Sequence, residues 1–146
     1  MTRLAVLGLA LTGAALAAEA GPAPPATATL TVIVRGVLPQ PSELRVGVFD
    51  AASYEDGPPP YRQRISAQSP ETVVTFEGLA PGRVAVKILQ DLNGNGEMDT
   101  TLIGIPEEPF GLSNDAKPGM SAPGFDETGF DLKPGPNAIT VTMQEM

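Results

Sequence analysis

The sequence predicts an all-β fold, a small antiparallel sandwich, on three observations. Short runs of alternating apolar and polar residues recur along the chain, with the period of a half-buried strand. Glycine and proline each occur 16 times in 146 residues, which is typical of a chain rich in turns. No long amphipathic helix is visible between these runs. An apolar fraction of 42% is sufficient for a hydrophobic core.

Two β-branched runs predict the first strands. Residues 29–35 alternate up to a glycine at position 36, and residues 44–49 alternate up to Asp50. The connection 37–43 is short and contains two prolines, as a hairpin-like turn would. We therefore expect these two strands to be neighbours.

The segment 50–70 is predicted to be a long surface crossover, because it is polar and contains three consecutive prolines. Strands are predicted at 72–76 and 83–90, separated by a turn at 79–82 that contains Pro81 and Gly82. About 30 residues rich in glycine, proline, asparagine and carboxylates follow.

The last strands are predicted at 129–132 and 138–143. Five to seven short strands predict a sandwich of immunoglobulin-like or transthyretin-like type, with a partly open β-barrel as the alternative. The apolar face of each run predicts a set of buried residues: Val32, Val34, Val46, Val48, Val74, Phe76, Val84, Val86, Ile88 and Val141.

Residues 1–20 have the pattern of a secretory signal peptide: one arginine, an apolar run at 4–16, then small residues. Cleavage is expected after Ala17 or Ala20. The apolar run of 13 residues is shorter than the roughly 20 that a membrane span needs. We expect an extended leader at 21–28, a single β-sandwich domain at 29–146, and a periplasmic or extracellular location.

Composition excludes several classes of site and partner. Without histidine or cysteine, the chain cannot carry a histidine-dependent triad, a cysteine nucleophile, a disulfide or a standard zinc site. Its net charge of −8 repels phosphate backbones and anionic lipid. We therefore expect no nucleic acid partner. Because no later segment approaches 18 uninterrupted apolar residues, we also expect no stable membrane insertion after signal cleavage.

The segment 91–99 has the ligand spacing of a calcium loop. Oxygen-bearing side chains occupy positions 1, 3, 5 and 9, and glycine occupies position 6, where the loop bends sharply. The carbonyl oxygen at position 7 would be a fifth ligand. The predicted calcium ligands are Asp91, Asn93, Asn95, Glu97 and Asp99.

The match to a calcium loop is incomplete, because position 12 is Leu102 rather than a bidentate carboxylate. With two charged side-chain ligands, the expected affinity is weak, with Kd about 0.1 to 1 mM. The alternative interpretation is metal-free: the two Asn-Gly pairs form turns, and Asp91 and Asp99 cap them through backbone hydrogen bonds.

Three further groups of residues suggest sites. Glu107 and Glu108 could act as the acid and base of a glycan hydrolase if they shared a cleft with Asp115, or one could supply the missing calcium ligand. A solvated loop is the simpler interpretation.

Tyr61, Arg62 and Arg64 form a basic and aromatic cluster that could recognise a carboxylate or sugar, although a solvated crossover explains it as well. Phe110, Phe125 and Phe130 are expected to pin loops to the core rather than to bind a ligand. No serine lies in a nucleophile elbow, and no phosphate-binding loop is present.

Several motifs occur together in one order. The run TVVTFEGLAPGRVAVKILQDLNGNGEMDTTLIGIPEEPFGLSNDA is followed by APGFDETGF and a final β run. This order resembles the secreted bacterial proteins of domain of unknown function 2141, over about 29–143. The FEGLAPGRVAV and DLNGNGEMD pairing is similar, more distantly, to transthyretin-like and Cna-B-like β-sandwich modules.

The resemblance implies a sandwich fold and no established activity. It places in the family motif Asp91, Asn93, Asn95, Asp99, Gly104, Pro106, Gly111, Ser113 and Asn114. Where the family often has Tyr-Gly-Phe-Ser-Asn-Asn, this chain has Leu112 at the second aromatic position.

Three classes of function remain after these exclusions. The first is an exported, non-enzymatic binding or structural module of the cell envelope, with an envelope protein or glycan as partner and calcium as a possible stabilising ion. The second is a carboxylate-based glycan hydrolase. The third is a small-ligand carrier, which would require a sizeable apolar cavity or an oligomer channel.

Overall fold

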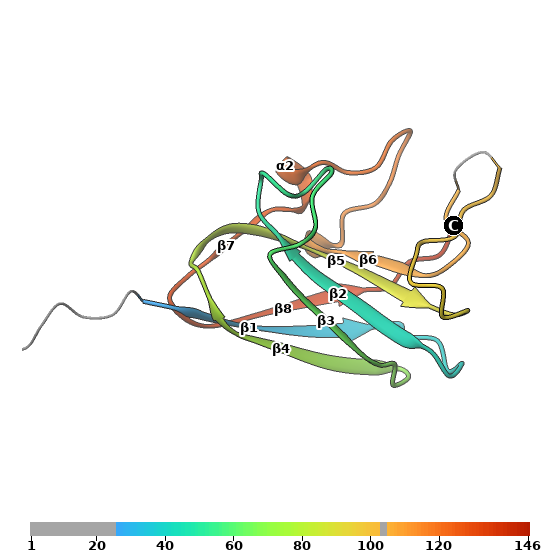
Figure 1. Cartoon of the computed structure of the whole chain (residues 1–146), viewed down its shortest axis with the longest axis horizontal. Helices are drawn as coiled ribbons and strands as arrows, with labels where there is room; N and C mark the ends of the chain where they lie inside the picture. The colour runs from blue at the N-terminus through green and yellow to red at the C-terminus, as the bar shows by residue number, and fades with distance from the viewer. Residues whose placement is uncertain (1–25, 103–104) are drawn as a thin grey trace, which may run out of the picture.

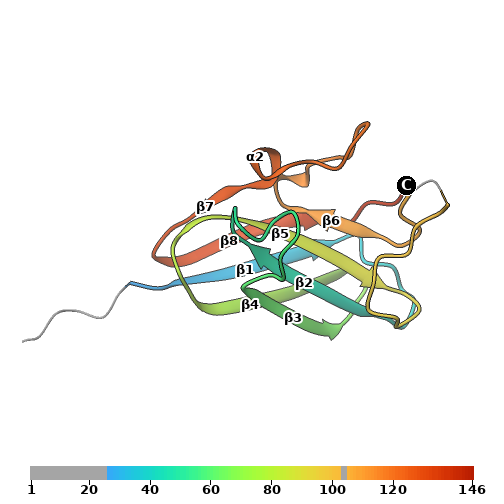
Figure 2. The same ribbon diagram turned by 45° about the horizontal axis from the view of Figure 1, so that its top comes forward.

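The computed structural model describes residues 26–102 and 105–146, so the predicted signal peptide and Gly104 lie outside the described residues. Two β-sheets pack face to face as layers (Figures 1 and 2). The predicted small β-sandwich is therefore confirmed. No helix in the described part of the chain is long and apolar enough to cross a membrane.

The first sheet has three strands in the order β4-β1-β8. Its central strand, β1 (Ala28–Arg35), pairs antiparallel with β4 (Glu71–Leu79) and parallel with β8 (Gly135–Thr142). The parallel pair is an exception to the antiparallel arrangement that the sequence predicted. It arises because β8 returns from the opposite sheet, so that no hairpin fixes its direction.

The second sheet has the order β3-β2-β5-β6. Its strands are β2 (Glu43–Phe49), β3 (Tyr61–Ser66), β5 (Gly82–Asp91) and β6 (Phe110–Leu112), paired antiparallel throughout. A short β7 (Phe130–Leu132) pairs with the start of β5.

The connections of the second sheet carry two short helices, a 3₁₀ turn η1 (Ser113–Asp115) and α2 (Phe125–Thr128). Both lie in the 30-residue segment that the sequence left without structure, as does β6. In Figure 1 the 91–99 loop and the C-terminus lie at the same end of the sandwich.

The core lies between the two sheets. All ten residues of the predicted buried set are buried, which confirms the predicted inward face of each strand. The largest fully buried aliphatic side chains are those of Leu30, Leu44 and Leu79. Burial of this apolar surface is the main stabilising contribution to the fold.

The prediction that the first two strands are neighbours is wrong, because β1 and β2 lie in different sheets. Their connection crosses between the sheets and is held by specific contacts. Val37 is buried and its N–H donates to the Pro70 carbonyl oxygen. The fully buried Gln90 side chain accepts the N–H of Leu38 and donates to its carbonyl oxygen.

The prediction of a structureless crossover at 50–70 is also wrong in its second half, which forms β3. Tyr61 and Ile65 turn toward the core, and Arg62 and Arg64 turn away from it. The turn at 79–82 does connect the two strands predicted around it. These strands, β4 and β5, belong to opposite sheets, so the turn is not a hairpin.

Candidate functional site

The 91–99 loop begins at the last residue of β5, where Asp91 is buried with its side chain 0% exposed. The Gly94 N–H donates to Asp91 Oδ1 at 2.9 Å, and the Gly96 N–H donates to Oδ2 at 2.7 Å. Both glycines have positive φ, 75° and 80°, which side chains rarely adopt. Asp91 therefore folds the loop around its own carboxylate.

Arg45 of β2 completes the environment of Asp91. Its Nε donates to Asp91 Oδ2 at 3.1 Å, and its Nη2 lies 3.0 Å from Glu43. Burial raises the pKa of the Asp91 carboxyl, but the N–H groups of Gly96 and Gly94 and the Arg45 guanidinium lower it more. The net pKa therefore lies below its ordinary value, and the carboxylate is ionised at neutral pH.

The other predicted ligands form a second cluster in the loop. The side-chain amides of Asn93 and Asn95 donate to the two oxygens of Asp99, at 2.5 and 2.7 Å. The Oδ1 atoms of the same two side chains accept the N–H of Asn95 and of Glu97. The structure thus brings Asn93, Asn95 and Asp99 into contact, while the Glu97 side chain is exposed.

Glu108 supports this loop from behind. Its carboxylate is buried and accepts the Leu92 N–H at 2.6 Å and the Asp99 N–H at 3.1 Å, so it joins both ends of the loop. Glu107 is exposed, and only its backbone N–H contacts the loop, at the Asp99 carbonyl. Within the described residues no three His, Cys, Asp or Glu side chains are placed to hold a metal. An ion here would have two carboxylates, Asp91 and Asp99, and would depend on asparagine and carbonyl oxygens for its other ligands.

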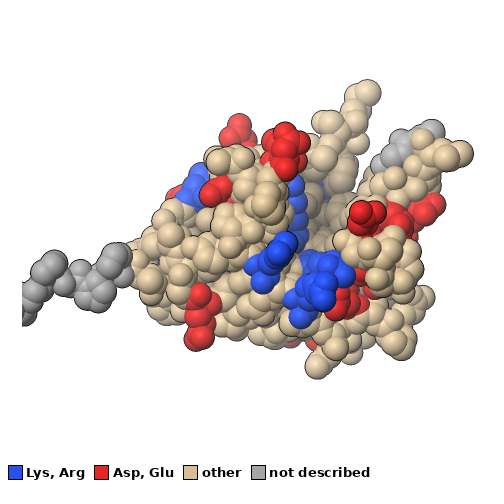
Figure 3. Space-filling model, viewed as in Figure 1, with Lys and Arg blue, Asp and Glu red and all other residues tan. Residues whose placement is uncertain are grey.

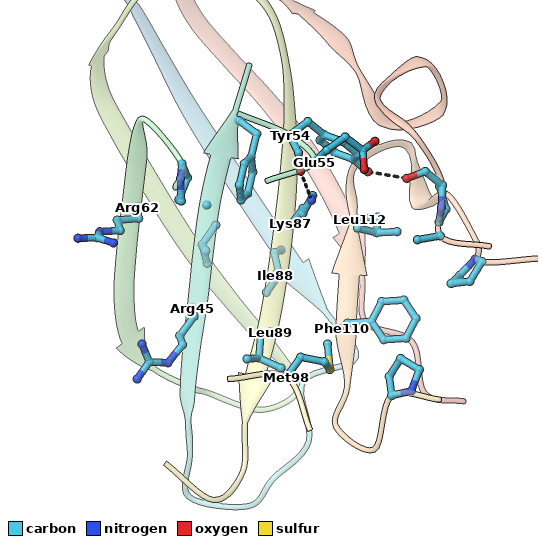
Figure 4. Close-up of a pocket in the computed structure, with 18 of the residues that line it drawn as sticks. Arg45, Tyr54, Glu55, Arg62, Lys87, Ile88, Leu89, Met98, Phe110 and Leu112 are labelled. Carbon is cyan, nitrogen blue, oxygen red and sulfur yellow. Dashed lines mark hydrogen bonds between the residues drawn. The ribbon is translucent and has the colours of Figure 1, made fainter. Parts of the chain in front are cut away.

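A groove with a volume of about 1080 Å³ lies on the outer face of the five-stranded sheet. Its floor is formed by β2, β5 and β6, and β3 forms one side (Figure 4). Three loop regions wall it: 54–59, the described residues 96–98 and 105–106, and 118–123. Gly96 and Met98 are part of this wall, so the predicted calcium loop forms one end of the groove.

Basic side chains lie along the β2, β3 and β5 part of the groove in two rows. Strand register places Arg62 opposite Gly47, and Gly47 opposite Lys87; the next row contains Arg64 and Arg45. Figure 3 shows Lys and Arg side chains gathered in the middle of this face. These four are nearly half of the nine basic residues in a chain of net charge −8.

The counter-ions of these cations are unequal. Arg45 pairs with Asp91 and Glu43, and Arg64 lies 3.7 Å from Glu43. None of the ion pairs formed within residues 26–102 and 105–146 includes Arg62 or Lys87. The groove therefore has an excess of positive charge.

Lys87 is held in the groove by the Tyr54 carbonyl and by the aromatic rings of Tyr54 and Phe49. Its Nζ donates to the Tyr54 carbonyl at 2.6 Å and lies 3.8 Å from the Tyr54 ring centroid and 4.7 Å from that of Phe49. The Tyr54 hydroxyl in turn donates to the Pro123 carbonyl at 2.8 Å, joining two of the loops (Figure 4). Burial lowers the pKa of the Lys87 ammonium, and nearby Glu55 acts in the opposite direction.

The β5 and β6 side of the groove is apolar. Leu89 pairs with Phe110 and Lys87 with Leu112 across the two strands. Figure 4 shows Met98 reaching toward Leu89 and Phe110, while Arg45 and Arg62 extend to the opposite side. Phe110 is buried, and Leu89 and Leu112 are half-buried. Four apolar side chains at the rim are exposed, and exposed apolar groups mark interaction surfaces: Met98, Ile105, Met120 and Met146.

The comparisons with known proteins decide the family. A family model described as "Uncharacterized protein conserved in bacteria (DUF2141)" matches residues 32–140. The chain belongs to the DUF2141 family. Neither the search of curated proteins nor the search of solved structures gave a match. The more distant likeness to transthyretin-like and Cna-B-like modules stays a prediction.

The DUF2141 motif residues after the loop hold the sandwich together. The buried Ser113 Oγ accepts the Val86 N–H at 2.9 Å and donates to the Thr128 carbonyl at 2.6 Å. Asn114, with φ of 62°, donates to the carbonyls of Glu127 and Gly129. This part of the motif is structural.

Two more residues of the same segment also have structural roles. A Cβ at Gly111 would lie 2.8 Å from Val141, so only glycine fits there. Asp115 Oδ1 accepts the Thr142 N–H from β8 at 2.8 Å. Two of the carboxylates considered for glycan hydrolysis therefore have separate partners. Glu108 accepts N–H groups of the 91–99 loop, and Asp115 accepts an N–H group of β8.

The predicted basic and aromatic cluster is divided by the pleat of β3. The Tyr61 hydroxyl accepts the Ala80 N–H, and its ring packs against the core. Arg62 and Arg64 line the groove, so they remain binding candidates. Of the three phenylalanines, Phe130 packs against the core, Phe125 contacts Tyr54, and Phe110 forms the groove wall.

Sequence reasoning missed most of the groove. Three of its residues lie on the outward faces of β2 and β5, whose inward faces were predicted correctly: Arg45, Lys87 and Leu89. A signal was present, because the outward-facing positions of these strands carry long cations and leucine rather than small polar residues. Without knowing which strands were neighbours, these residues could not be placed on one surface.

Proposed function

We propose that this DUF2141 protein is an exported, non-enzymatic binding module of the cell envelope, and that the groove of the five-stranded sheet is its binding surface. The groove carries this proposal. Its volume of about 1080 Å³ is at the upper end of the range for ligand sites. The small-ligand class calls for a sizeable apolar cavity or an oligomer channel. The groove is open and apolar along one half, which supports binding of a ligand over a purely structural role.

A non-enzymatic role is supported by what the acidic side chains do. Glu55 is the one acidic residue among those that line the groove, within the described chain. Glu108 and Asp115 are committed to backbone N–H groups in two different places. A hydrolase of the paired-carboxylate type needs two carboxyl groups on either side of one bond, and the groove does not offer this pair.

Calcium at the 91–99 loop is the second part of the proposal. The negative charge of Asp99 is compensated by hydrogen bonds from the side-chain amides of Asn93 and Asn95. A cation would take the place of these N–H groups if both side chains turned their Oδ1 atoms toward it. Asp91 and the Glu97 carbonyl would complete the ligand set. Since the loop forms one end of the groove, an ion there would also fix the position of Met98.

Export is tested by the mass of the mature protein. We expect the protein recovered from the periplasm or the medium to lack residues 1–17 or 1–20, because the N-terminal sequence has the order of a signal peptide. Intact-mass spectrometry of the cell fractions measures this. Recovery of the full chain, Met1 to Met146, from the membrane fraction would contradict export.

Binding through the groove is tested by capture with matched variants. The immobilised domain, residues 21–146, is incubated with envelope extract, and the retained proteins, glycans and lipids are identified by mass spectrometry. In Leu112→Trp the larger indole occupies the apolar part of the groove beside Lys87, and the retained material should fall at least about tenfold. Val73→Trp places the same ring on the exposed outer face of β4, in the other sheet, and should retain it.

Equal retention by wild type and both variants, all shown to be folded by circular dichroism, would remove the groove as the binding surface. Loss in Val73→Trp alone would assign binding to the opposite sheet.

A further inference from the structure

We propose that the groove takes a small anionic amphiphile, a molecule with a hydrocarbon body and one carboxylate, sulfate or phosphate group. This inference rests on the proposed function, since it names the class of ligand for the same groove. The groove has two unlike halves, and each half selects one part of such a molecule.

The cationic half selects the charge. Four basic residues and one acidic residue line the groove, although the whole chain has a net charge of −8. Two of the cations already have acidic partners, because Arg45 pairs with Glu43 and Asp91, and Arg64 pairs with Glu43. Arg62 and Lys87 keep their charge uncompensated by any ion pair of the described residues, so an anion gains most beside them.

Lys87 is placed for such a role by the protein itself. The Tyr54 carbonyl takes one of its three donors, and its Nζ lies over the rings of Tyr54 and Phe49. The lysine is thereby held in one position at the boundary between the two halves of the groove. A fixed cation costs less conformational entropy on binding than a free one.

The apolar half selects the hydrocarbon. Leu112 is the cross-strand neighbour of Lys87, and Leu89 and Phe110 form the next pair along the same two strands. A hydrocarbon lying on this surface therefore begins directly beside the ammonium. Met98 and Met120 stand at its rim, and flexible thioether side chains adapt to chains of different length.

The size and shape of the site favour a single small molecule over a protein surface or a membrane. The groove is concave and walled by three loops, as ligand sites are. Outside the groove the excess negative charge of the protein opposes approach to an anionic bilayer. A single amphiphile can enter the groove without bringing a charged surface against the rest of the molecule.

The test is isothermal titration of the mature domain with decanoate below its micelle concentration, compared with decylammonium and acetate. We expect decanoate to bind with one site, decylammonium to bind at least about tenfold more weakly, and acetate to show no measurable binding. Arg62→Met and Lys87→Met, which keep an apolar stem, should each weaken decanoate about tenfold, the value expected for one charge-assisted contact.

Arg83→Met is the matched control for charge. Arg83 pairs with Asp131 at 3.6 Å, on β5 next to β7 and outside the groove lining, so its loss should change decanoate affinity less than twofold. Arg62 is exposed on an edge strand, and its replacement leaves the core intact. Arg62→Met therefore keeps the test decisive if Lys87→Met unfolds.

Four results would overturn the inference: no binding of decanoate, equal binding of decylammonium, affinity unchanged in both groove variants, or binding only to phosphatidylglycerol vesicles, which would assign the face to a membrane. If decanoate fails while Leu112→Trp still abolishes capture from envelope extract, the ligand class is wrong and the groove remains the binding surface. If both fail, the proposed function itself is wrong.

Discussion

Replacement of Phe76 by alanine is expected to lower the free energy of unfolding by about 3 to 5 kcal/mol. Phe76 lies on β4 with 4% of its surface exposed and is the largest side chain in the core cluster between the sheets. Removing the ring loses the free energy of its burial and leaves a cavity, which the two packed sheets close only in part. Equilibrium denaturation in urea measures the loss.

Val73→Ala is the matched control on the same strand. Val73 points outward and is 55% exposed, so the change should stay within about 0.5 kcal/mol. A loss below about 1 kcal/mol for Phe76→Ala would mean that the inner face of β4 is misassigned.

Asp91→Ala is expected to have the second largest effect, a destabilisation of about 2 to 4 kcal/mol. It leaves the N–H groups of Gly94 and Gly96 without their acceptor and Arg45 without one of its two acidic partners. The loss is smaller than for a fully buried ion pair, because the Arg45 side chain is 26% exposed and water can solvate it.

The same variant separates the two interpretations of the loop. If calcium binds, wild-type protein at about ten times Kd gains roughly 1.4 kcal/mol, visible as a higher Tm in millimolar calcium than in chelator. Asp91→Ala should lose this increment. A wild-type Tm indifferent to millimolar calcium would remove the ion and leave the Asn-Gly turns, closed by Asp91 and Asp99, as the whole explanation.

The inward faces of the strands could be predicted because alternation is a local property. In the middle of β1, β2, β4 and β5 large apolar residues recur at every second position, and one face of a strand must be buried whatever its neighbours are. Pairing is not local. The two prolines of the 37–43 connection fit a hairpin as well as a crossover, and the contacts that decide it come from Pro70 and Gln90, far along the chain.

β3 escaped prediction for a related reason. Its sequence, YRQRIS, carries two arginines, and its inward residues are only half-buried because it is an edge strand. Local apolar content is then too low to indicate a strand. The loop at 91–99 was found because its spacing is a property of contiguous residues. The role of Glu108 was not, because a carboxylate that binds backbone N–H groups 9 and 16 residues away leaves no spacing signal.

The binding site that we propose needs neither histidine nor cysteine. Its groups are ordinary cations and leucines, which the sheet and the three loop regions place on one surface. The most specific sequence motif lies at one end of this surface. If calcium and ligand binding are coupled through Met98, each should strengthen the other by the same factor.

Amide hydrogen exchange of the mature domain, with and without the material that it captures from envelope extract, tests most directly whether the groove is the binding surface. We predict slower exchange in the loop regions 54–59, 96–98, 105–106 and 118–123 and in β6, with β1, β4 and β8 unchanged. Slower exchange confined to the β4-β1-β8 sheet, with the three loops unchanged, would contradict it.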